Sequence, residues 1–420
     1  MRNQRTGLVA AAVLSVLAVP TAKAIDVNAG KWKLSFDGNV NANYIYSNCQ
    51  KASDANVVDG GLACVSDSSS SSSVSNGLLP AALTVSGATT QDGWDLGFTF
   101  GLYPGISTND GGSPNLQAAD PTGFGHTALG TAGLDVRQVF LTVGNKEFGT
   151  IMAGRNIGLF GADAILNDMT LLGVGAGNGN YAAPANTSLG SIGLGYIYTD
   201  WLSQIDYTTP DMMGAKVTVG IFDPLNTLGQ APVNHSSPGF QGKVAYTHGG
   251  LYLSASGLYQ KQRISCTDAA IDLNPCFAPV SFDTVDYSST AFDLGGKYDI
   301  DGFEVMGWYY TANGVGTTGL YVLSQDLAGH PRHSDGFIAQ VTYQLGPTKI
   351  GFNYGESNLD RTALDPGVLV SKNDKWTLGV YHNLTENLLL VGEFSQLESH
   401  NNLSQTNKSW NLNVGLFLKF

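Results

Sequence analysis

The chain ends in a segment whose side chains alternate between apolar and polar types. In an extended strand such alternation places the two types on opposite faces. One face holds Trp410, Leu412, Val414, Leu416, Leu418 and Phe420, and the other holds Asn411, Asn413, Gly415, Phe417 and Lys419. In a soluble sheet the apolar face would pack on a core, whereas in a membrane barrel it would face lipid. One strand cannot decide between these interpretations.

The same period of two recurs along the chain, for example over 32–44 and 94–102, with aromatic residues near the segment ends. Strands of about ten residues suit a tilted crossing of a bilayer, and aromatic ends are typical of interfacial girdles. We expect sixteen strands, over 30–46, 77–88, 92–103, 132–144, 147–156, 190–209, 214–222, 239–248, 250–262, 288–299, 302–312, 335–345, 348–358, 373–383, 387–398 and 409–420. Short turns alternate with longer polar loops between them. The pattern therefore predicts an all-β fold, a transmembrane antiparallel β-barrel of sixteen strands.

Residues 1–24 have the three parts of a secretory signal peptide. Arg2 and Arg5 precede an apolar run over 7–19, and Ala22-Lys23-Ala24 precedes the expected cleavage site. No later stretch approaches the roughly 20 unbroken apolar residues that a membrane helix needs. We therefore expect an exported chain with one mature domain over 25–420.

The charge balance narrows the range of partners. Three of the 21 Lys and Arg residues lie before residue 25, which leaves 18 of them against 34 Asp and Glu. An acidic chain of this kind is not expected to bind nucleic acid. Only 13% of the residues are charged and 53 are glycine, which suits a β-rich chain. No linker or change of composition divides the mature part, so we expect a single domain.

The four cysteines fall into two local pairs, Cys49 with Cys64 and Cys266 with Cys276, each in a polar stretch between expected strands. In an exported protein two loop disulfides are expected, although four cysteines allow three pairings. A metal site is the competing interpretation. It lacks a Cys-x-x-Cys spacing or a nearby histidine, so we expect no metal and no cofactor.

Three motifs resemble the general trimeric porins of Gram-negative bacteria. The first is a strand, tight turn and strand, with Arg-Gln-Val-Phe-Leu-Thr-Val over 137–143 and Phe-Gly-Thr-Ile-Met-Ala-Gly-Arg-Asn over 148–156. The second is Ser-Gln-Ile-Asp-Tyr-Thr-Thr-Pro-Asp-Met-Met-Gly over 203–214, and the third is the terminal Phe420. Their order and the strand count agree with that family over essentially the whole mature chain.

The resemblance implies a homotrimer in outer-membrane lipid and lipopolysaccharide, with a water-filled pore for small hydrophilic solutes. It also implies that the third loop, over 157–189, folds into the barrel and narrows the pore. By this resemblance Asp163 and Asp168 on the loop are expected to face Arg137 and Arg155 on the wall. The resulting transverse field would orient dipolar solutes, while apolar solutes would gain nothing from it.

The chain departs from the family at one wall position. The family often has a third wall arginine seven residues before the tyrosine of the second motif, and that position here is Asp200. The mature chain has only five arginines. With Asp163 and Asp168 also present, we expect the pore to prefer cations.

Alternatives remain open for both residues and function. Arg137 and Arg155 could be structural, and Asp163 could be a helix cap. His330 and His333 could bind a metal, but no third ligand is evident. The rival functions are a substrate-specific channel and a barrel adhesin without an open pore. A barrel enzyme would need a paired serine and histidine, which the spacing does not provide, so no catalytic residue is expected.

Overall fold

The structure is a computed structural model that describes residues 24–50, 58–64, 70–106, 134–177, 187–227, 234–265, 284–326 and 328–420. The expected signal peptide, apart from Ala24, lies outside this part of the chain. Cys266 and Cys276 also lie outside it. Among the described residues, no helix is long and apolar enough to cross a membrane.

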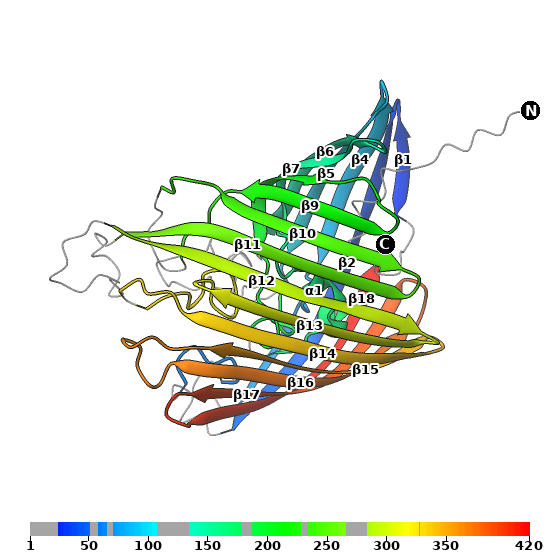
Figure 1. Cartoon of the computed structure of the whole chain (residues 1–420). Coiled ribbons are helices and arrows are strands. Elements are labelled where there is room, and N and C mark those ends of the chain that lie inside the picture. The colour runs from blue at the N-terminus through cyan, green and yellow to red at the C-terminus, as the bar shows by residue number, and fades with distance from the viewer. Residues whose placement is uncertain are drawn as a thin grey trace, which may run out of the picture.

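Sixteen antiparallel strands form a closed barrel (Figure 1). They are β2 (Trp32–Gln50), β4 (Ala82–Gln91), β5 (Trp94–Pro104), β6 (Leu134–Asn145), β7 (Gly149–Ile157), β8 (Trp201–Thr208), β9 (Ala215–Phe222), β10 (Gly239–His248), β11 (Leu251–Ser265), β12 (Thr284–Ile300), β13 (Phe303–Asn313), β14 (His333–Leu345), β15 (Thr348–Leu359), β16 (Val370–Asn383), β17 (Leu388–Asn401) and β18 (Thr406–Lys419). Short turns gather at one end and long connections at the other (Figure 1). The prediction of a sixteen-stranded barrel is confirmed.

The barrel closes where β18 pairs with β2, with Leu416 opposite Ala42. Beyond the strand end, Gly38 N–H donates to Phe420 O at 3.0 Å and Phe420 N–H donates to Gly38 O at 3.1 Å. A Cβ at Gly38 would clash with Ala82 O and press on the Phe420 ring. The terminal phenylalanine therefore lies at the seam, against a position where only glycine fits.

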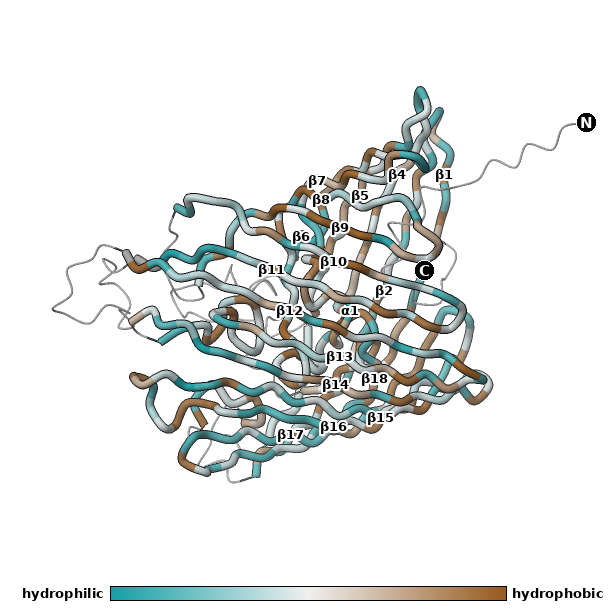
Figure 2. Tube along the Cα trace, viewed as in Figure 1, coloured by the Kyte–Doolittle hydropathy of each residue, from teal (hydrophilic) through white to brown (hydrophobic). Residues whose placement is uncertain are grey.

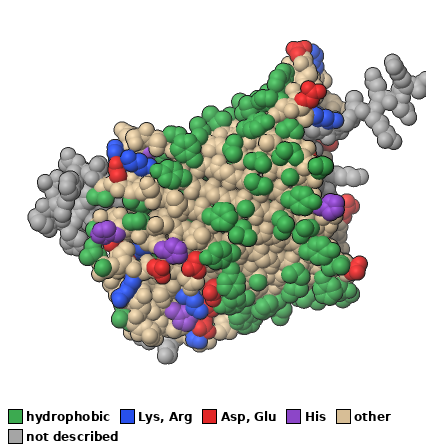
Figure 3. All heavy atoms as spheres, viewed as in Figure 1, with side chains coloured by type: hydrophobic (Ala, Val, Ile, Leu, Met, Phe, Trp, Pro, Cys, Tyr) green, Lys and Arg blue, Asp and Glu red, His purple; other side chains and the backbone are tan. Residues whose placement is uncertain are grey.

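Burial shows which face of the barrel is the outer one. On β18, Val414 is 57% exposed and Leu416 is 52% exposed, whereas Asn411 and Asn413 are 0% exposed. A soluble sheet would show the reverse. Hydrophilic and hydrophobic residues alternate along the strands (Figure 2), and apolar side chains gather on the outside over the half nearer the short turns (Figure 3). The apolar face is therefore the lipid-facing one.

Aromatic rings mark two levels on this outer face. One chain of rings crosses five adjacent strands, with centroids 6.3, 5.5, 6.0 and 5.5 Å apart, through Phe352, Trp376, Phe394, Trp410 and Tyr46. A second group near the short turns includes Trp94, Phe148 and Tyr207, with successive centroids 5.6 Å apart. Aromatic girdles of this kind lie at the two membrane interfaces.

Two further strands, β1 (Ile25–Ala29) and β3 (Ser70–Ser75), were not expected from the sequence. β4 pairs with β2 only up to Asn39. The part of β2 after Asn39 therefore has a free edge where β4 ends, and β3 pairs with Asn43–Asn48 along this edge. Backbone hydrogen bonds thus make the serine-rich residues of β3 part of the sheet, although no strand was expected there. β1 forms an N-terminal hairpin with β2.

Two expected strand starts were wrong. The strand expected over 190–209 begins at Trp201, and the strand expected over 77–88 begins at Ala82. The cysteine expectation is confirmed for one pair, because Cys49 and Cys64 form a disulfide with their Cα atoms 5.5 Å apart. It joins the end of β2 to residues 58–64, whose backbone is also held by Ser399 Oγ.

Val414→Arg tests the lipid-facing assignment. Because Val414 lies midway along the exposed face of β18, an arginine there should lower the free energy of unfolding in lipid vesicles by about 2–4 kcal/mol. Denaturant titration of the refolded protein measures this. Val414→Leu is the matched control and should change little, and an equal loss for both variants would contradict a lipid-facing position.

Candidate pore constriction

The segment after β7 crosses the inside of the barrel instead of forming an outer loop. Its backbone N–H groups donate to side chains on the inner face of successive strands. Leu159 N donates to Gln241 Oε1 of β10 at 2.9 Å, and Gly161 N donates to Asp293 Oδ2 of β12 at 2.6 Å. These wall side chains are buried. The segment therefore follows the inner wall.

Helix α1 (Ala162–Asn167) and the 3-10 helix η5 (Met169–Leu172) form the middle of the segment. Met169 N donates to Gln340 Oε1 of β14 at 2.6 Å. The Gln340 amide also donates to Asn167 O at 3.1 Å, so one glutamine holds the junction of the two helices. A loop was expected over 157–189, and the segment between β7 and β8 runs from Gly158 to Asp200.

The part of the segment after η5, here called the far arm (residues 173–177), is held by a buried carboxylate. Val174 N and Gly175 N both donate to Glu393 Oε2 of β17 at 2.8 Å. Ser395 Oγ donates to Gly175 O at 2.9 Å. A Cβ on Gly173 would clash with the Glu393 carboxylate, so a larger residue there would push the carboxylate aside.

The two loop acids make different contacts from those expected. Asp163 forms an ion pair with Lys243 of β10, with Oδ1 and Nζ 3.1 Å apart. Asp168 accepts hydrogen bonds from neutral donors, namely Thr170 N at 2.9 Å, Tyr196 Oη at 2.8 Å and Asn353 Nδ2 at 3.2 Å. Neither acid contacts Arg137 or Arg155 in the described residues.

Arg137 lies on the inner wall, where it is 4% exposed. Its Nε donates to Asp135 Oδ2 at 2.9 Å. The guanidinium carbon lies 5.0 Å from the ring centre of Tyr103 and 5.7 Å from that of Trp201. Two aromatic rings and one carboxylate thus fix this charge near the wall.

Arg155 is on the other side of the wall, which corrects the expectation that both arginines face the lumen. It pairs with Val139 and Ser203, whose side chains are exposed on the outer face, and paired residues project to the same side. A break in the β5–β6 register at Arg137 explains the difference. This bulge reverses the alternation, so Arg137 points inward while Val139 and its partner Arg155 point outward.

Asp200 lies next to these groups at the end of the segment, with a φ of 60° and 2% exposure. Its Oδ1 accepts from Trp201 N at 2.7 Å. Burial raises the pKa of Asp200 to about 6, although the Trp201 N–H and the charges of Arg155 and Arg137 oppose that rise. The structure thus brings Asp200 and Arg137 together, with Asp135 as a partner that was not foreseen.

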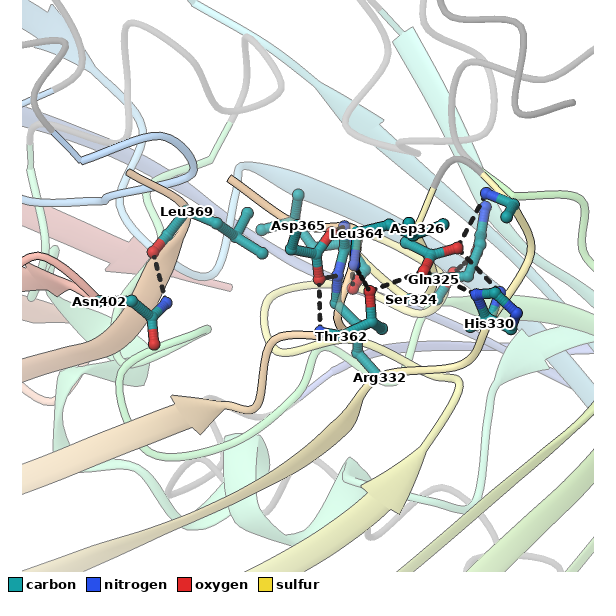
Figure 4. A network of polar contacts seen from close by, with 12 residues as sticks. Ser324, Gln325, Asp326, His330, Arg332, Thr362, Leu364, Asp365, Leu369 and Asn402 are labelled. Atoms are coloured by element: carbon teal, nitrogen blue, oxygen red, sulfur yellow. Dashed lines mark hydrogen bonds and ion pairs between the residues drawn. The ribbon is translucent and has the colours of Figure 1, made fainter. Parts of the chain in front are cut away.

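At the long-loop end, three connections are tied to one another (Figure 4). Arg332 donates to both oxygens of Asp365, with Nε–Oδ2 at 2.8 Å and Nη2–Oδ1 at 2.5 Å. Thr362 Oγ1 donates to Asp326 Oδ2 at 2.6 Å, and Asn402 Nδ2 donates to Leu369 O at 3.1 Å. Burial alone would raise the pKa of Asp365, but the hydrogen bonds from Arg332 and Thr362 N–H hold it below its usual value.

The histidines of this region are bound to acids. His330 Nδ1 lies 2.9 Å from Asp326 Oδ2, and His333 Nδ1 lies 3.3 Å from Asp360 Oδ2. Across the described ranges, no group of three or more His, Cys, Asp or Glu residues could hold a metal ion.

Comparison with known proteins decides the family. A model of the Gram-negative porins matches residues 9–402. The chain belongs to the Gram-negative porin family. This porin therefore forms a channel in the outer membrane, through the barrel described above.

Solved structures share the fold of this porin at low sequence identity. The outer membrane channel DcaP of Acinetobacter baumannii is 13% identical, with 95% of this chain and 100% of that chain covered and a TM-score of 0.67. An anion-selective porin from Comamonas acidovorans is 15% identical, with 93% and 100% covered and a TM-score of 0.61. OmpT of Vibrio cholerae in its trimer form is 15% identical, with 93% and 99% covered and a TM-score of 0.51. No curated protein matches the sequence.

Gly173→Ala tests whether Glu393 holds the segment. The added methyl would displace the carboxylate and release Val174 and Gly175, at a cost of about 1–3 kcal/mol in the free energy of unfolding. We expect noisier open-channel current in planar bilayers. Gly392→Ala is the control, because a Cβ there meets nothing within 4 Å. If the current noise of Gly173→Ala equals that of Gly392→Ala, the hold of Glu393 on the far arm does not affect the channel.

Proposed function

We propose that this porin is a diffusion pore for small hydrophilic solutes and ions, with a preference for cations. The observation that supports it best is the run of hydrogen bonds from the backbone of residues 159–175 to inner side chains of β10, β12, β14 and β17. A segment fixed across the lumen narrows the pore and leaves a polar route for hydrated solutes. Asp163, Asp168, Asp200 and Arg137 are the proposed charges of the constriction.

The balance of inner charges favours cations. No ion pair within the described residues involves the inner carboxylates of Asp168, Asp200, Asp206, Asp293 or Glu393. Most nearby cations are instead neutralised, since Arg137, Lys243 and Lys297 are paired with acids. Lys349 and Lys375, at inner positions of β15 and β16, form no ion pair within the described ranges. The excess of negative charge should raise the local concentration of cations.

The proposal also includes the assembly and the membrane setting. OmpT of Vibrio cholerae, which shares the fold, has been solved as a trimer, and we infer the same state for this chain. From the aromatic girdles we infer that outer-membrane lipid and lipopolysaccharide surround the barrel. Residues 1–24 serve as the export signal. Cross-linking in native membranes tests the trimer, and sequencing of the mature N-terminus tests the export signal.

A substrate-specific channel is a second candidate, because the inner segment packs into an apolar cluster. Ile165 and Leu194 of the segment contact a cluster that includes Trp308 and Ile338 of the wall. Such packing reduces the space that is left for solutes. Solute flux that saturates with concentration would favour this candidate, whereas flux proportional to concentration favours diffusion.

The cation preference is measured by the reversal potential in a salt gradient. In a gradient of potassium chloride we expect a reversal potential whose sign shows that potassium is several times more permeable than chloride. A reversal potential of the opposite sign would refute the preference, whatever the conductance. Lys408→Met, at an outer position, is a control that should leave the reversal potential unchanged.

The preference should also depend on pH through Asp200. Because the pKa of Asp200 is raised to about 6, its carboxyl is mostly ionised at pH 7.5 and mostly protonated at pH 5. Acidification removes this negative charge, so the potassium-to-chloride ratio should fall between these two values. Asp200→Asn keeps a side chain that tolerates a positive φ and should lower the ratio at pH 7.5. A variant that titrates like the wild type would exclude Asp200 as the cause.

A further inference from the structure

The side chain of Lys375 is buried inside the barrel. It is 1% exposed, on the inner face of β16, between Gly355 of β15 and Leu397 of β17. Its Nζ has no hydrogen-bond partner within the part of the chain that the structure describes. Lysine is almost never fully buried unless its charge is compensated. We therefore expect negatively charged groups close to the Lys375 ammonium.

Neighbouring contacts show where that charge lies. The next inner residue on β16 is Thr377, which pairs with Asn353 on one side and Ser395 on the other. Asn353 donates to Asp168, and Ser395 donates to Gly175 O in the far arm. Lys375 is thus one inner position away from the wall residues that hold both parts of the segment. On β17 the next inner residue beyond Ser395 is Glu393, so the acids beside this part of the wall are Asp168 and Glu393.

Both carboxylates hold the segment without a charged donor. Glu393 accepts from Val174 N, Gly175 N and Tyr381 Oη, the last at 2.6 Å. Asp168 accepts from Thr170 N, Tyr196 Oη and Asn353 Nδ2. Two ionised acids in a buried region are costly unless a cation compensates them.

We propose that Lys375 is a positioning residue whose single positive charge offsets part of the negative charge of Asp168 and Glu393 and thereby holds residues 168–177 against β15, β16 and β17. The inference rests on the proposed function, because the same segment is the proposed constriction. The ammonium group acts through the two carboxylates and does not need to contact a passing solute. The long apolar stem of the lysine lets the charge reach them from the wall.

Lys375→Met removes the charge and nearly keeps the length of the side chain. In refolded full-length protein we expect hydrogen exchange of the amides in 168–177 to speed up by about tenfold, as the clamp opens locally more often. Adding Glu393→Gln removes one of the two uncompensated acids and should bring exchange back toward the wild-type rate. Lys375→Arg keeps the charge and should exchange slowly. Lys372→Met, on the outer face of the same strand, should have no effect.

Unchanged exchange in Lys375→Met, or no rescue in the double variant, would overturn the role of Lys375. If Lys375→Met does not refold, the double variant must refold, and its failure would equally overturn the role. Conductance recorded on the same samples separates the two proposals. Faster exchange with unaltered conductance would support Lys375 as a positioning residue and refute the segment as the constriction.

Discussion

The structure depends on the requirement that no backbone hydrogen bond be left unmade inside a membrane. A sheet satisfies it only when it has no free edge, so β18 must pair with β2. Closure then divides every strand into a lipid face and a lumen face. Apolar side chains occupy the first and polar side chains the second, which is the reverse of a soluble sheet.

The polar inner wall has a second consequence, because its side chains are available to bind backbone. Gln241, Asp293, Gln340 and Glu393 accept from N–H groups of the inner segment at points spread around the barrel. The segment is thereby held at several separate points along the inner wall. The same acids that hold it leave negative charge inside the barrel. The hold on the segment and the proposed preference for cations would thus come from one set of residues.

Alternation within single strands was enough to predict most of the fold. The strands β13, β15 and β17 begin and end within a few residues of their expected bounds. What failed depends on contacts between strands. The bulge at Arg137 reverses the face of the residues that follow, and no local pattern in 134–145 reveals it. For the same reason β3 was not expected, since it pairs with the part of β2 that β4 does not reach.

The candidate site was predicted in part. Arg137, Asp163, Asp168 and Asp200 do lie in or beside the segment, but their partners could not be foreseen. Lys243 and Glu393 have inner positions that alternation indicates, yet nothing in the sequence shows which part of the segment each one contacts. Such pairings arise from the path of the segment across the barrel, and this path is set by tertiary packing.

We propose that the inner segment, and not the barrel wall, sets the width of the pore. Conductance in the presence of neutral polymers of graded size measures that width directly, because polymers that enter the pore reduce the current. An unobstructed barrel of sixteen strands would admit polymers nearly as wide as its lumen. We predict that entry stops at polymers much smaller than this. Entry of polymers close to the full width of the barrel would contradict a constriction by residues 158–200.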